Sequence, residues 1–544
     1  MTAYTCKYTP VEIFAGFDEK CVLLNKAADN FEYSQAIMHQ NMCSHVKAIT
    51  EEIRKNKTEN FIFVNCCDSL RRAYDVMKSQ IDGFVFFMDL PHSDSSYAVK
   101  LFKAELLRLI DDFEKYSGKK FDIEKFLKSF TANNTDNSSD YIAVIGARCE
   151  DALINNVRSA SPISVRDLTC AENREVKTPN GKENSLDSVI SEYAKALLSQ
   201  IPCMRMTDIS GRKSLINDEK IKGIIYHTVK FCDYYDFEYK NLIKETALPI
   251  IKIETDYTKQ SAGQLSTRLE AYFEAMKKDL PNESNPVLRK GKYFAGIDSG
   301  STTTNLVVID SNCNTVASAI VRTGFNAKAG AQKALEQSGI DINDISYLVA
   351  TGYGRKNIPF ANENVTEITC HAKGAAFLCP DADIIIDIGG QDSKVISLGS
   401  AGEVTNFVMN DKCAAGTGRF LENMARVIEM NIEDMAKRGL SYNEELNISS
   451  MCTVFAESEV VSLIAENKSI DDIIHALNKS VAVKISSLAG RAATKGKAVM
   501  TGGVARNPGV VREIEKQLSQ SIYVPENPDL CGALGAALIA LNRK

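Results

Sequence analysis

Short apolar runs alternate with amphipathic stretches in the first half of the chain. Apolar runs of about five residues are typical of buried strands, and apolar residues spaced three or four apart indicate helices. This alternation is characteristic of α/β layers. It predicts two doubly wound α/β subdomains, at residues 1–135 and 140–276. The strands are expected at 61–65, 84–88, 141–145, 223–226 and 249–253, and helices at 98–113 and 265–276.

A polar segment follows these subdomains. Residues 277–292, K-K-D-L-P-N-E-S-N-P-V-L-R-K-G-K, have a composition typical of interdomain linkers. A second polar break, N-N-T-D-N-S-S-D at 133–140, separates the two subdomains. At 544 residues the chain is too long for one core, and its length is typical of about three or four domains. We therefore place a further domain at 293–544.

The second half opens with a strand, a glycine turn and another strand, F-A-G-I-D-S-G-S-T-T-T-N-L-V-V-I-D at 294–310. Because the chain has no G-x-x-x-x-G-K-[ST], this turn is not a Walker-type P-loop. Small residues in such a turn let backbone N–H groups approach phosphate oxygens. Asp298, at the strand end, is suited to hold Mg²⁺ through water. The predicted phosphate-binding residues are Ser299, Gly300, Ser301, Thr302 and Thr303.

A similar element follows at 384–397, I-I-I-D-I-G-G-Q-D-S-K-V-I-S. Asp387 again ends a strand and precedes the glycine pair Gly389 and Gly390. Two such hairpins facing each other would clamp a β/γ-phosphate–Mg²⁺ unit from both sides, and Gln391 would position an attacking water. We therefore predict ATP and Mg²⁺ as ligands, with Asp298, Asp387 and Gln391 as the catalytic residues.

Glycines also mark a predicted adenosine-binding segment. In V-M-T-G-G-V-A-R-N-P at 499–508, Gly502 and Gly503 lie between a strand and a helix, where they suit a purine face. One Asp-x-Gly turn alone is more typical of a plain hairpin. Two of them, followed by the G-G element over about 250 residues, favour a nucleotide-binding domain.

Two cysteines lie inside this nucleotide module, although nucleotide hydrolysis needs no thiolate. Cys413 and Cys452 fall between the phosphate and adenosine segments. Their flanks, N-D-K-C-A-A-G-T-G-R-F and M-C-T-V-F-A-E-S-E, are small and polar rather than apolar. A helix is predicted from about Arg419, and its N-terminus would stabilise an anionic group. This combination indicates ATP energy coupled to a metal centre.

Composition narrows the functional classes. A 44% hydrophobic and 25% charged chain is typical of a soluble globular protein, and a net charge of −6 argues against nucleic-acid or anionic-membrane partners. No run of about 18 apolar residues predicts a membrane span, and the N-terminus has no signal-peptide pattern. We expect a cytoplasmic protein, in which the fifteen cysteines are not structural disulfides. The absence of C-x-x-C weakens a zinc-ribbon interpretation.

Cysteines of the first half follow the ends of predicted strands. Cys67 comes after 61–65, Cys232 after I-I-Y-H-T-V-K-F, and Cys170 closes I-S-V-R-D-L-T-C. The carboxyl ends of strands gather at one edge of an open α/β sheet. If both subdomains point this edge at a common cleft, three cysteines come from each side. The other three cysteines, in turn-like contexts, are Cys6, Cys43 and Cys203.

The nucleotide motifs resemble those of the actin–hexokinase–chaperone ATPase superfamily, which implies duplicated ribonuclease-H-like subdomains in residues 293–544. I-D-S-G-S-T-T-T, T-G-Y-G-R, D-I-G-G-Q-D-S-K and the two cysteine segments are similar to one branch. That branch contains the activators of 2-hydroxyacyl-CoA dehydratases and the ATPase subunits of benzoyl-CoA reductases. The resemblance implies a homodimer with one intersubunit [4Fe-4S] cluster. It also implies Cys413 and Cys452 as the cluster ligands, and a ferredoxin or flavodoxin as electron donor.

The first half resembles the dehydratase component that such an activator reduces, on N-M-C-S-H-V-K-A, N-C-C-D-S-L-R-R and K-F-C-D-Y-Y-D-F-E-Y. D-L-T-C-A-E-N-R, I-P-C-M-R-M and Y-T-C-K-Y-T-P resemble its double-cubane relatives. This implies an [8Fe-9S] double-cubane cluster. Cys66 is an alternative to Cys67 as a ligand, although the order C-D-S favours Cys67. The implied ligands are Cys6, Cys43, Cys67, Cys170, Cys203 and Cys232, and the ordinary thiols are Cys21, Cys149, Cys313, Cys370, Cys379 and Cys531.

The leading hypothesis is therefore an ATP-driven low-potential reductase. The electron would pass from the intersubunit cluster to the N-terminal cluster, for reduction or radical activation of a small molecule or a 2-hydroxyacyl-CoA. One alternative is an activator that reduces a separate dehydratase partner, because the first half is shorter than is usual for the family. A second alternative is a sugar or small-molecule kinase of the same superfamily. His227 and His371, each near a cysteine, are expected to be structural.

Overall fold

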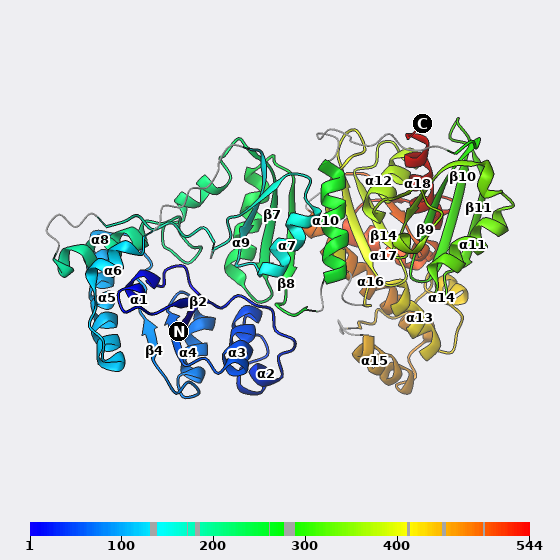
Figure 1. Cartoon of the computed structure of the whole chain (residues 1–544). Helices are drawn as coiled ribbons and strands as arrows, with labels where there is room; N and C mark the ends of the chain where they lie inside the picture. The colour runs from blue at the N-terminus through cyan, green and yellow to red at the C-terminus, as the bar shows by residue number, and fades with distance from the viewer. Residues whose placement is uncertain are drawn as a thin grey trace. The chain divides into compact units, whose positions relative to one another are not determined.

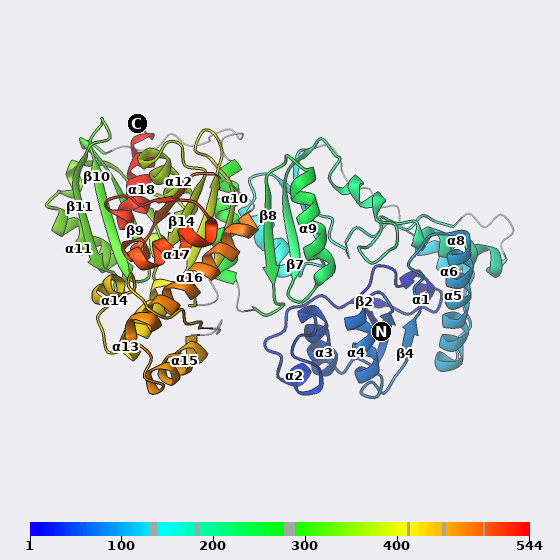
Figure 2. The ribbon, with the colours of Figure 1, turned by 180° about the vertical axis from the view of Figure 1, so that it is seen from behind.

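The computed structural model describes most of the chain as two compact units, Met1–Leu269 and Glu270–Lys544, which we consider separately (Figures 1 and 2). The division falls inside helix α10 (Ala262–Met276), ahead of the predicted linker. Residues 277–288 of that linker lie outside the described residues. The described residues are 1–130, 139–170, 172–179, 185–259, 262–276 (backbone only for 262–264), 289–410, 414–448, 453–492 and 496–543.

The first unit contains two four-stranded sheets, in the orders β2-β1-β3-β4 and β6-β5-β7-β8. Every strand pair in both sheets is parallel, so successive strands are joined by crossovers. All residues of β3 and β5 are buried, because helices cover both faces of a parallel sheet. The strands are β1 (Thr2–Tyr4), β2 (Cys21–Leu23), β3 (Asn60–Val64), β4 (Val85–Met88), β5 (Tyr141–Gly146), β6 (Ser164–Asp167), β7 (Ile221–Val229) and β8 (Ile250–Thr255).

One helix of this unit packs against helices that are distant from it in the sequence. Helix α8 belongs to the second segment of the unit by sequence, yet it packs against α5 and α6 of the first (Figure 1). The rings of Tyr193 and Phe126 meet edge to face at 5.1 Å in this contact. The helices are α1 (Val11–Ala15), α2 (Glu32–Ile37), α3 (Ser44–Asn56), α4 (Asp68–Met77), α5 (Ser96–Ser117), α6 (Ile123–Lys128), α7 (Asp151–Ala160), α8 (Leu186–Leu198), α9 (Asp233–Glu245) and the 3₁₀ helix η1 (Ser210–Leu215).

The second unit contains two five-stranded sheets with the same topology. Their orders are β11-β10-β9-β12-β13 and β16-β15-β14-β17-β18. In each, three antiparallel strands form a meander, and two further strands join parallel to its first strand and to each other. The first sheet holds β9 (Tyr293–Ser299), β10 (Thr303–Ile309), β11 (Thr315–Arg322), β12 (Ile345–Thr351) and β13 (Glu363–Asn364). The second holds β14 (Ile384–Ile388), β15 (Ser393–Leu398), β16 (Val404–Asn410), β17 (Ala498–Thr501) and β18 (Ile522–Tyr523).

Two helices of this unit, α12 and α18, cross at a contact that only glycine permits. A Cβ atom on Gly535 would lie 1.8 Å from the carbonyl oxygen of Cys370, and one on Gly374 would lie 2.2 Å from that of Cys531. Helix α18 packs on β9 and β12, whereas α12 contacts β14 and β16. The contact therefore joins the two halves of the unit. The α-helices are α11 (Ala327–Ser338), α12 (Glu367–Leu378), α13 (Gly418–Val427), α14 (Ile432–Arg438), α15 (Thr453–Ala465), α16 (Ile470–Ala492), α17 (Pro508–Leu518) and α18 (Cys531–Leu541), and the short 3₁₀ helices are η4 (Ile342–Asp344), η5 (Arg355–Asn357), η6 (Gly503–Arg506) and η7 (Pro528–Leu530).

The last residues of α10 pack on the second unit, which explains where the chain divides. The Glu274 carboxylate accepts hydrogen bonds from the backbone N–H of Thr366, at 3.1 Å, and from the Thr369 hydroxyl, at 2.7 Å. Glu270 pairs with Arg355 at 2.6 Å. Within the described residues no helix is long and apolar enough to span a membrane.

Candidate functional sites

The two predicted phosphate turns of the second unit face each other. A Cβ atom on Gly390, in the turn after β14, would lie 2.4 Å from Oγ1 of Thr302, in the turn after β9. Each turn is closed by a backbone hydrogen bond, from Gly300 N–H to the Thr303 carbonyl and from Gly389 N–H to the Asp392 carbonyl. The structure thus places the two turns face to face.

Each of the two turns has the same kinds of residue beside it. Asp298 lies at the penultimate position of β9 and Asp387 lies in β14, and both are buried. Gly352, after β12, has φ +87°, and its missing Cβ would lie 2.6 Å from Oδ1 of Asp298. Gly502, after β17, has φ +83°, and its missing Cβ would lie 2.8 Å from Oδ1 of Asp387. Each half therefore brings a buried aspartate and a left-handed glycine to the same place.

His371 lies between these two aspartates. Its Nε2 is 3.7 Å from Oδ2 of Asp298, and its Nδ1 is 3.6 Å from Oδ1 of Asp387 and 3.2 Å from the hydroxyl of Thr501. Burial disfavours the charged ring, but the two carboxylates, Asp387 foremost, raise the pKa of His371 well above its usual value. The sequence drew attention to His371 beside Cys370 and led us to expect a structural histidine, but its position between the two aspartates depends on how α12 packs against α18.

Lys394 is a second charged group that the sequence motif did not single out. Its Nζ lies 2.8 Å from Glu367, 3.0 Å from Asp392 and 3.3 Å from Asp387. Burial opposes ionisation of Asp387, but His371 and Lys394 together lower its pKa below the usual value. Gln391, by contrast, is exposed at the turn, and Gly503 begins η6 directly after Gly502.

Helix α13 is bonded directly to the second phosphate turn. The backbone N–H groups of Gly418 and Arg419 donate to the carbonyl oxygens of Gly389 and Gly390 at 2.9 and 2.8 Å. Cys413 and Cys452 themselves lie outside the described residues. Helix α15 begins directly after Cys452 and exposes four apolar side chains, Val454, Phe455, Val461 and Ile464.

In the first unit, one cavity gathers all six predicted cysteine ligands. It has a volume of about 70 Å³, about five times the minimum that a single water needs. Three of these cysteines come from each predicted subdomain, and none of the cysteines expected to be ordinary thiols lines the cavity. Cys66 lines it beside Cys67, so the choice between these two stays open. The cysteines that line the cavity are Cys6, Cys43, Cys66, Cys67, Cys170, Cys203 and Cys232.

Three helices begin at cysteines of this cavity. Cys43, Cys67 and Cys232 each directly precede the first residue of a helix, α3, α4 and α9. The Cys67 sulfur accepts a hydrogen bond from the N–H of Leu70 at 3.5 Å, as an N-cap does. Hydrogen bonding with Cys66 lowers the pKa of Cys67 to about 6. Positive helix ends thus face the sulfurs.

The cavity also holds cations without carboxylates. Lys7, Arg148 and Arg205 line it, no Asp or Glu does, and none of the three forms an ion pair within the described part of the chain. Lys7 donates to Oδ1 of Asn173 at 2.8 Å, and Arg148 to the carbonyl of Leu24 at 3.0 Å. Because a buried cation without a counter-charge is costly, the cavity suits an anionic occupant.

This donor set fits an iron–sulfur group rather than a single ion. Within the described residues no group of three or more His, Cys, Asp or Glu is placed to hold one metal ion. Thiolates around a cavity, with cations and helix ends behind them, are the ligands that iron–sulfur clusters take. Nε2 of His45, which lines the cavity, has no hydrogen-bond partner among the described residues. His227 does not line it and is structural, as expected, since its ring nitrogens contact the Ala147 carbonyl and the Thr255 hydroxyl.

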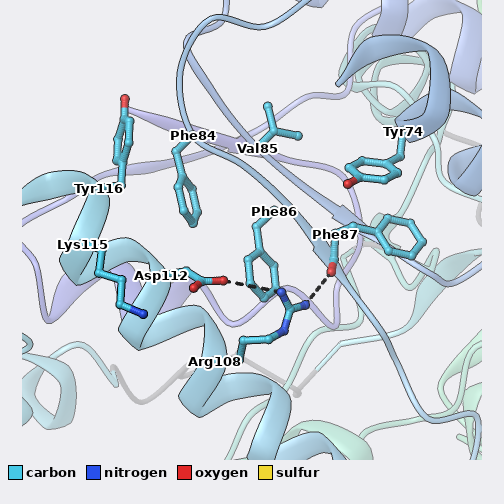
Figure 3. A pocket seen from close by; sticks show the side chains of 9 residues that line it. All are labelled: Tyr74, Phe84, Val85, Phe86, Phe87, Arg108, Asp112, Lys115 and Tyr116. Carbon is cyan, nitrogen blue, oxygen red and sulfur yellow. Dashed lines mark hydrogen bonds and ion pairs between the residues drawn. The ribbon is translucent and has the colours of Figure 1, made fainter. Parts of the chain in front are cut away.

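A larger groove lies along β4, at the edge of the first sheet, and has a volume of about 670 Å³ (Figure 3). Arg108 stacks on the Phe86 ring at 4.0 Å, donates to the Phe87 carbonyl at 2.9 Å and pairs with Asp112 at 3.5 Å. A charged side chain laid over an edge strand protects it from pairing with another chain. We interpret this groove as a covered sheet edge without catalytic groups.

Comparison with known proteins identifies both halves. Residues 295–540 match the BadF/BadG/BcrA/BcrD ATPase family, and residues 6–155 and 142–276 match the 2-hydroxyglutaryl-CoA dehydratase, D-component. The 2-hydroxyisocaproyl-CoA dehydratase activator of Clostridioides difficile is 44% identical over 254 residues, which are 46% of this chain and 95% of that protein. The chain belongs to the BadF/BadG/BcrA/BcrD ATPase family. Its first half is a dehydratase D-component domain, so the resemblance inferred from the motifs is confirmed.

A second relative and a solved structure are also similar to this chain. The activator of lactoyl-CoA dehydratase from Anaerotignum propionicum is 48% identical over 252 residues, 46% of this chain and 97% of that protein. The solved structure of the activator of the 2-hydroxyisocaproyl-CoA dehydratase from Clostridium difficile with bound ADPNP is 44% identical. It covers 46% of this chain and 94% of its own, with a TM-score of 0.45. The repeated strand order of the second unit confirms the predicted duplicated fold.

Proposed function

We propose that this protein couples ATP hydrolysis in its second half to electron transfer into an iron–sulfur cluster held by its first half. The convergence of six cysteines on one cavity, with cations and without carboxylates, carries the proposal. Membership of an ATPase family supports the nucleotide chemistry. We propose the domains as 1–135 and 140–276 for the acceptor, 277–292 for the linker and 293–544 for the ATPase.

In the first half, the ligands would be Cys6, Cys43, Cys67, Cys170, Cys203 and Cys232, and the group would be a double-cubane [8Fe-9S] cluster. Such a cluster supplies a low-potential store of electrons when it is bound. The side chains around it contribute charge and exclusion of water. Lys7, Arg148 and Arg205 balance the negative charge of the thiolates, and apolar residues close the cavity.

In the second half, Asp298 and Asp387 would hold the Mg²⁺ ion of ATP through water, since Mg²⁺ retains most of its waters. Gln391, exposed at the second turn, would orient the attacking water. The backbone of the two turns would bind the phosphates, with the small side chains leaving room for them. The proposed nucleotide-binding residues are Ser299, Gly300, Ser301, Thr302, Thr303, Gly389, Gly390, Gly502 and Gly503.

The link between α13 and the second turn supports a coupling route. A change at Gly389 and Gly390 on phosphate release displaces the start of α13, because the two are joined by backbone hydrogen bonds. Cys413 lies only a few residues upstream of α13, and Cys452 directly before α15. We propose these two cysteines as ligands of a [4Fe-4S] cluster shared by a homodimer. The apolar side chains that α15 exposes support a subunit contact there.

The relatives are named for activation of 2-hydroxyacyl-CoA dehydratases. For this chain we propose a ferredoxin or flavodoxin as electron donor and a small molecule or an acyl-CoA as the final acceptor. The names of the relatives also support a second candidate, an activator that reduces a separate dehydratase. Membership of the activator family argues against the kinase alternative.

Anaerobic iron analysis with EPR, before and after addition of ATP, tests the proposal. We expect about eight iron atoms per chain in the first half, and ATP-dependent reduction of that cluster. Cys232→Ala should lose iron from the cavity, whereas Cys21→Ala, a cysteine of the same unit that does not line it, should not. Substantially fewer than about eight iron atoms per chain would refute the double-cubane form. Activation of an added dehydratase by Cys232→Ala protein would favour the separate-partner alternative.

A further inference from the structure

Arg205 contacts two cysteine sulfurs of the cavity at once. Its NH1 group donates to Sγ of Cys203 at 3.4 Å, and its NH2 group donates to Sγ of Cys232 at 3.8 Å. Its buried Nε has no hydrogen-bond partner among the described residues. Cys203 comes from the loop before η1, and Cys232 directly precedes α9, so the guanidinium joins ligands of two separate segments.

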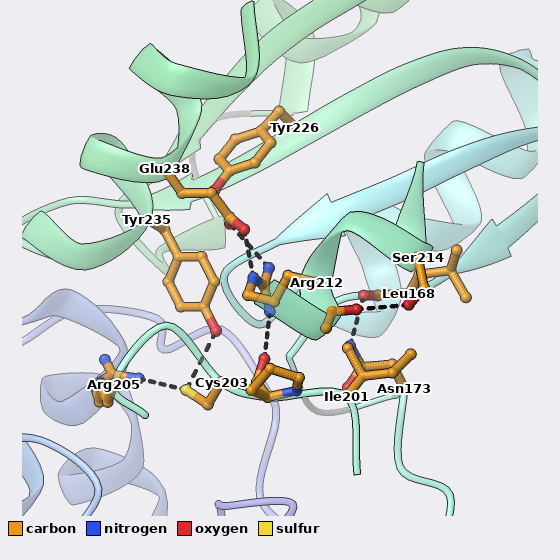
Figure 4. Close-up of polar contacts among 12 residues, drawn as sticks. Leu168, Asn173, Ile201, Cys203, Arg205, Arg212, Ser214, Tyr226, Tyr235 and Glu238 are labelled. Carbon is orange, nitrogen blue, oxygen red and sulfur yellow. Dashed lines mark hydrogen bonds and ion pairs between the residues drawn. The ribbon is translucent and has the colours of Figure 1, made fainter. Parts of the chain in front are cut away.

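A neighbouring arginine, Arg212, has a carboxylate partner, which Arg205 lacks (Figure 4). Arg212, in η1, is bound through its guanidinium to the carboxylate of Glu238, with one contact of 2.9 Å, and donates to the Pro202 carbonyl. Both arginines lie near the ring of Tyr235. The fold thus gives Arg212 a carboxylate, whereas the only polar partners given to Arg205 in the described residues are sulfur atoms.

Two aromatic side chains lie near the Arg205 guanidinium. The Tyr234 ring lies 4.9 Å from the guanidinium carbon, and the Tyr235 hydroxyl lies 3.5 Å from the Cys203 sulfur on its other side. Tyr234 is 47% exposed, and Arg205 itself is partly buried. A partly buried cation that contacts sulfur acts more strongly on the nearest charges than an exposed one, because water screens it less.

Hydrogen bonds from N–H groups to ligand sulfurs withdraw negative charge from those sulfurs. In iron–sulfur proteins such bonds raise the reduction potential of the cluster. A fixed positive charge beside the same sulfurs acts in the same direction, because it stabilises the form that carries one more electron. Arg205 contributes both effects from a single side chain.

We infer that Arg205 is a positioning residue that sets the reduction potential of the N-terminal iron–sulfur cluster through its contacts with Cys203 and Cys232. The inference rests on the proposed function, because it requires a cluster in this cavity. Lys7 and Arg148 line the same cavity, but each donates to an amide or a carbonyl oxygen rather than to sulfur. Among these three cations, Arg205 is therefore the one that donates hydrogen bonds to the cysteine sulfurs.

The test uses full-length protein that also carries Cys413→Ser and Cys452→Ser, so that only the first half contributes a cluster signal. Arg205→Lys keeps the charge but loses the two-pronged donor, and Arg205→Gln loses the charge. An EPR-monitored redox titration measures the potential of each variant, and iron analysis measures occupancy. Lys213→Gln is the matched control, because it removes a 69% exposed charge from the same segment.

We expect Arg205→Gln to keep its iron and to titrate at a lower potential than the parent protein. Arg205→Lys should lie between the two, and Lys213→Gln should not differ from the parent. Pulsed EPR in D₂O adds a second readout, in which Arg205→Gln loses the exchangeable-proton coupling contributed by the guanidinium and keeps the one from Leu70 N–H at Cys67.

A potential equal to that of the parent in an iron-replete Arg205→Gln protein overturns the inference. If Arg205→Gln does not retain iron, Arg205→Lys decides, because an unchanged potential and an unchanged proton coupling in that variant overturn it equally. A parent protein without iron in its first half is a different result, since it refutes the proposed function itself.

Discussion

Nζ of Lys394 lies 3.3 Å from Oδ2 of Asp387 in the second half of the chain. The same ammonium group contacts Glu367 and Asp392, so one buried cation is shared by three carboxylates. These carboxylates raise the pKa of Lys394 well above its usual value, against the effect of burial. Lys394 therefore holds Asp387 charged and in place beside the phosphate turn.

Lys394→Met should abolish this support. Removal of one partner of a buried ionic network costs about 3–5 kcal/mol, because the remaining charges are left uncompensated. We expect a lower midpoint of thermal unfolding and an ATPase rate reduced by at least about 100-fold, which steady-state phosphate release would measure. Lys373→Met removes an exposed lysine from α12 and should change neither quantity. An ATPase rate near that of the parent would show that Asp387 does not depend on Lys394.

Gly535→Ala should destabilise the ATPase half severely. The new methyl group would lie 1.8 Å from the Cys370 carbonyl oxygen, so α12 and α18 would have to separate. We expect a loss of more than about 3 kcal/mol, seen as a lower midpoint in thermal unfolding. Gly490, in α16, has no atom within 4 Å of its missing Cβ. Gly490→Ala should therefore be neutral or stabilise by up to about 1 kcal/mol. Equal effects of the two substitutions would contradict the close contact.

The raised pKa of Asp167 should make the folding stability of the first half depend on pH. Burial raises the pKa of Asp167 to about 6, above its usual 3.8. Between these values the unfolded chain releases a proton that the folded chain keeps, so stability falls as pH rises from about 4 to about 6. Asp167→Asn cannot ionise, and it should be more stable than the parent by about 1–2 kcal/mol above pH 6.

Thermal unfolding of the Asp167→Asn and parent proteins at pH 5 and pH 7.5 would measure this difference. The advantage of the variant should be larger at the higher pH. Asp187→Asn, in α8, is a suitable control because the Asp187 side chain is 74% exposed. A pH-independent difference between Asp167→Asn and the parent would show that Asp167 ionises normally in the folded chain.

The adjacent thiols Cys66 and Cys67 should differ in iron binding. Cys67 caps α4 and accepts a hydrogen bond from Leu70 N–H, which stabilises its thiolate. Hydrogen bonding to Cys6 and Cys67, by contrast, raises the pKa of Cys66 well above its usual value. We expect Cys67→Ala to lose iron and Cys66→Ala to retain it, as anaerobic iron analysis of the two purified proteins would show. Iron loss confined to Cys66→Ala would reverse the assignment.

Local patterns in the sequence were sufficient for the longer strands of the first half and for two of its helices. All five strands predicted in the first half appear within a few residues of their expected bounds, as do helices α5 and α10. The strands β1 and β2 were not predicted, because runs of three residues carry too little periodicity, whereas β6 lies within the run I-S-V-R-D-L-T-C. The duplicated turns of the second half were visible because glycine and aspartate mark them locally.

Side chains that reach a site only through tertiary packing could not be found from local sequence patterns. His371 lies between Asp298 and Asp387 only because glycines let α12 and α18 approach closely. Arg205 had a weak local signal, its place two residues after Cys203 in I-P-C-M-R-M. Its lack of a carboxylate partner is a property of the packed cavity, which no single segment reveals.

The hydrogen bonds that join α13 to the second phosphate turn involve only backbone atoms, from Gly418 and Arg419 to Gly389 and Gly390. No side chain takes part, so a substitution at Arg419 leaves these bonds in place, whereas a Cβ atom on Gly390 would lie 2.4 Å from Oγ1 of Thr302 and one on Gly418 would lie 3.2 Å from the Gly389 carbonyl oxygen. Proline at 418 or 419 would remove a donor, and an inserted residue would shift the register. The proposed link between nucleotide and α13 therefore depends on backbone geometry, which changes in the surrounding surface side chains do not alter.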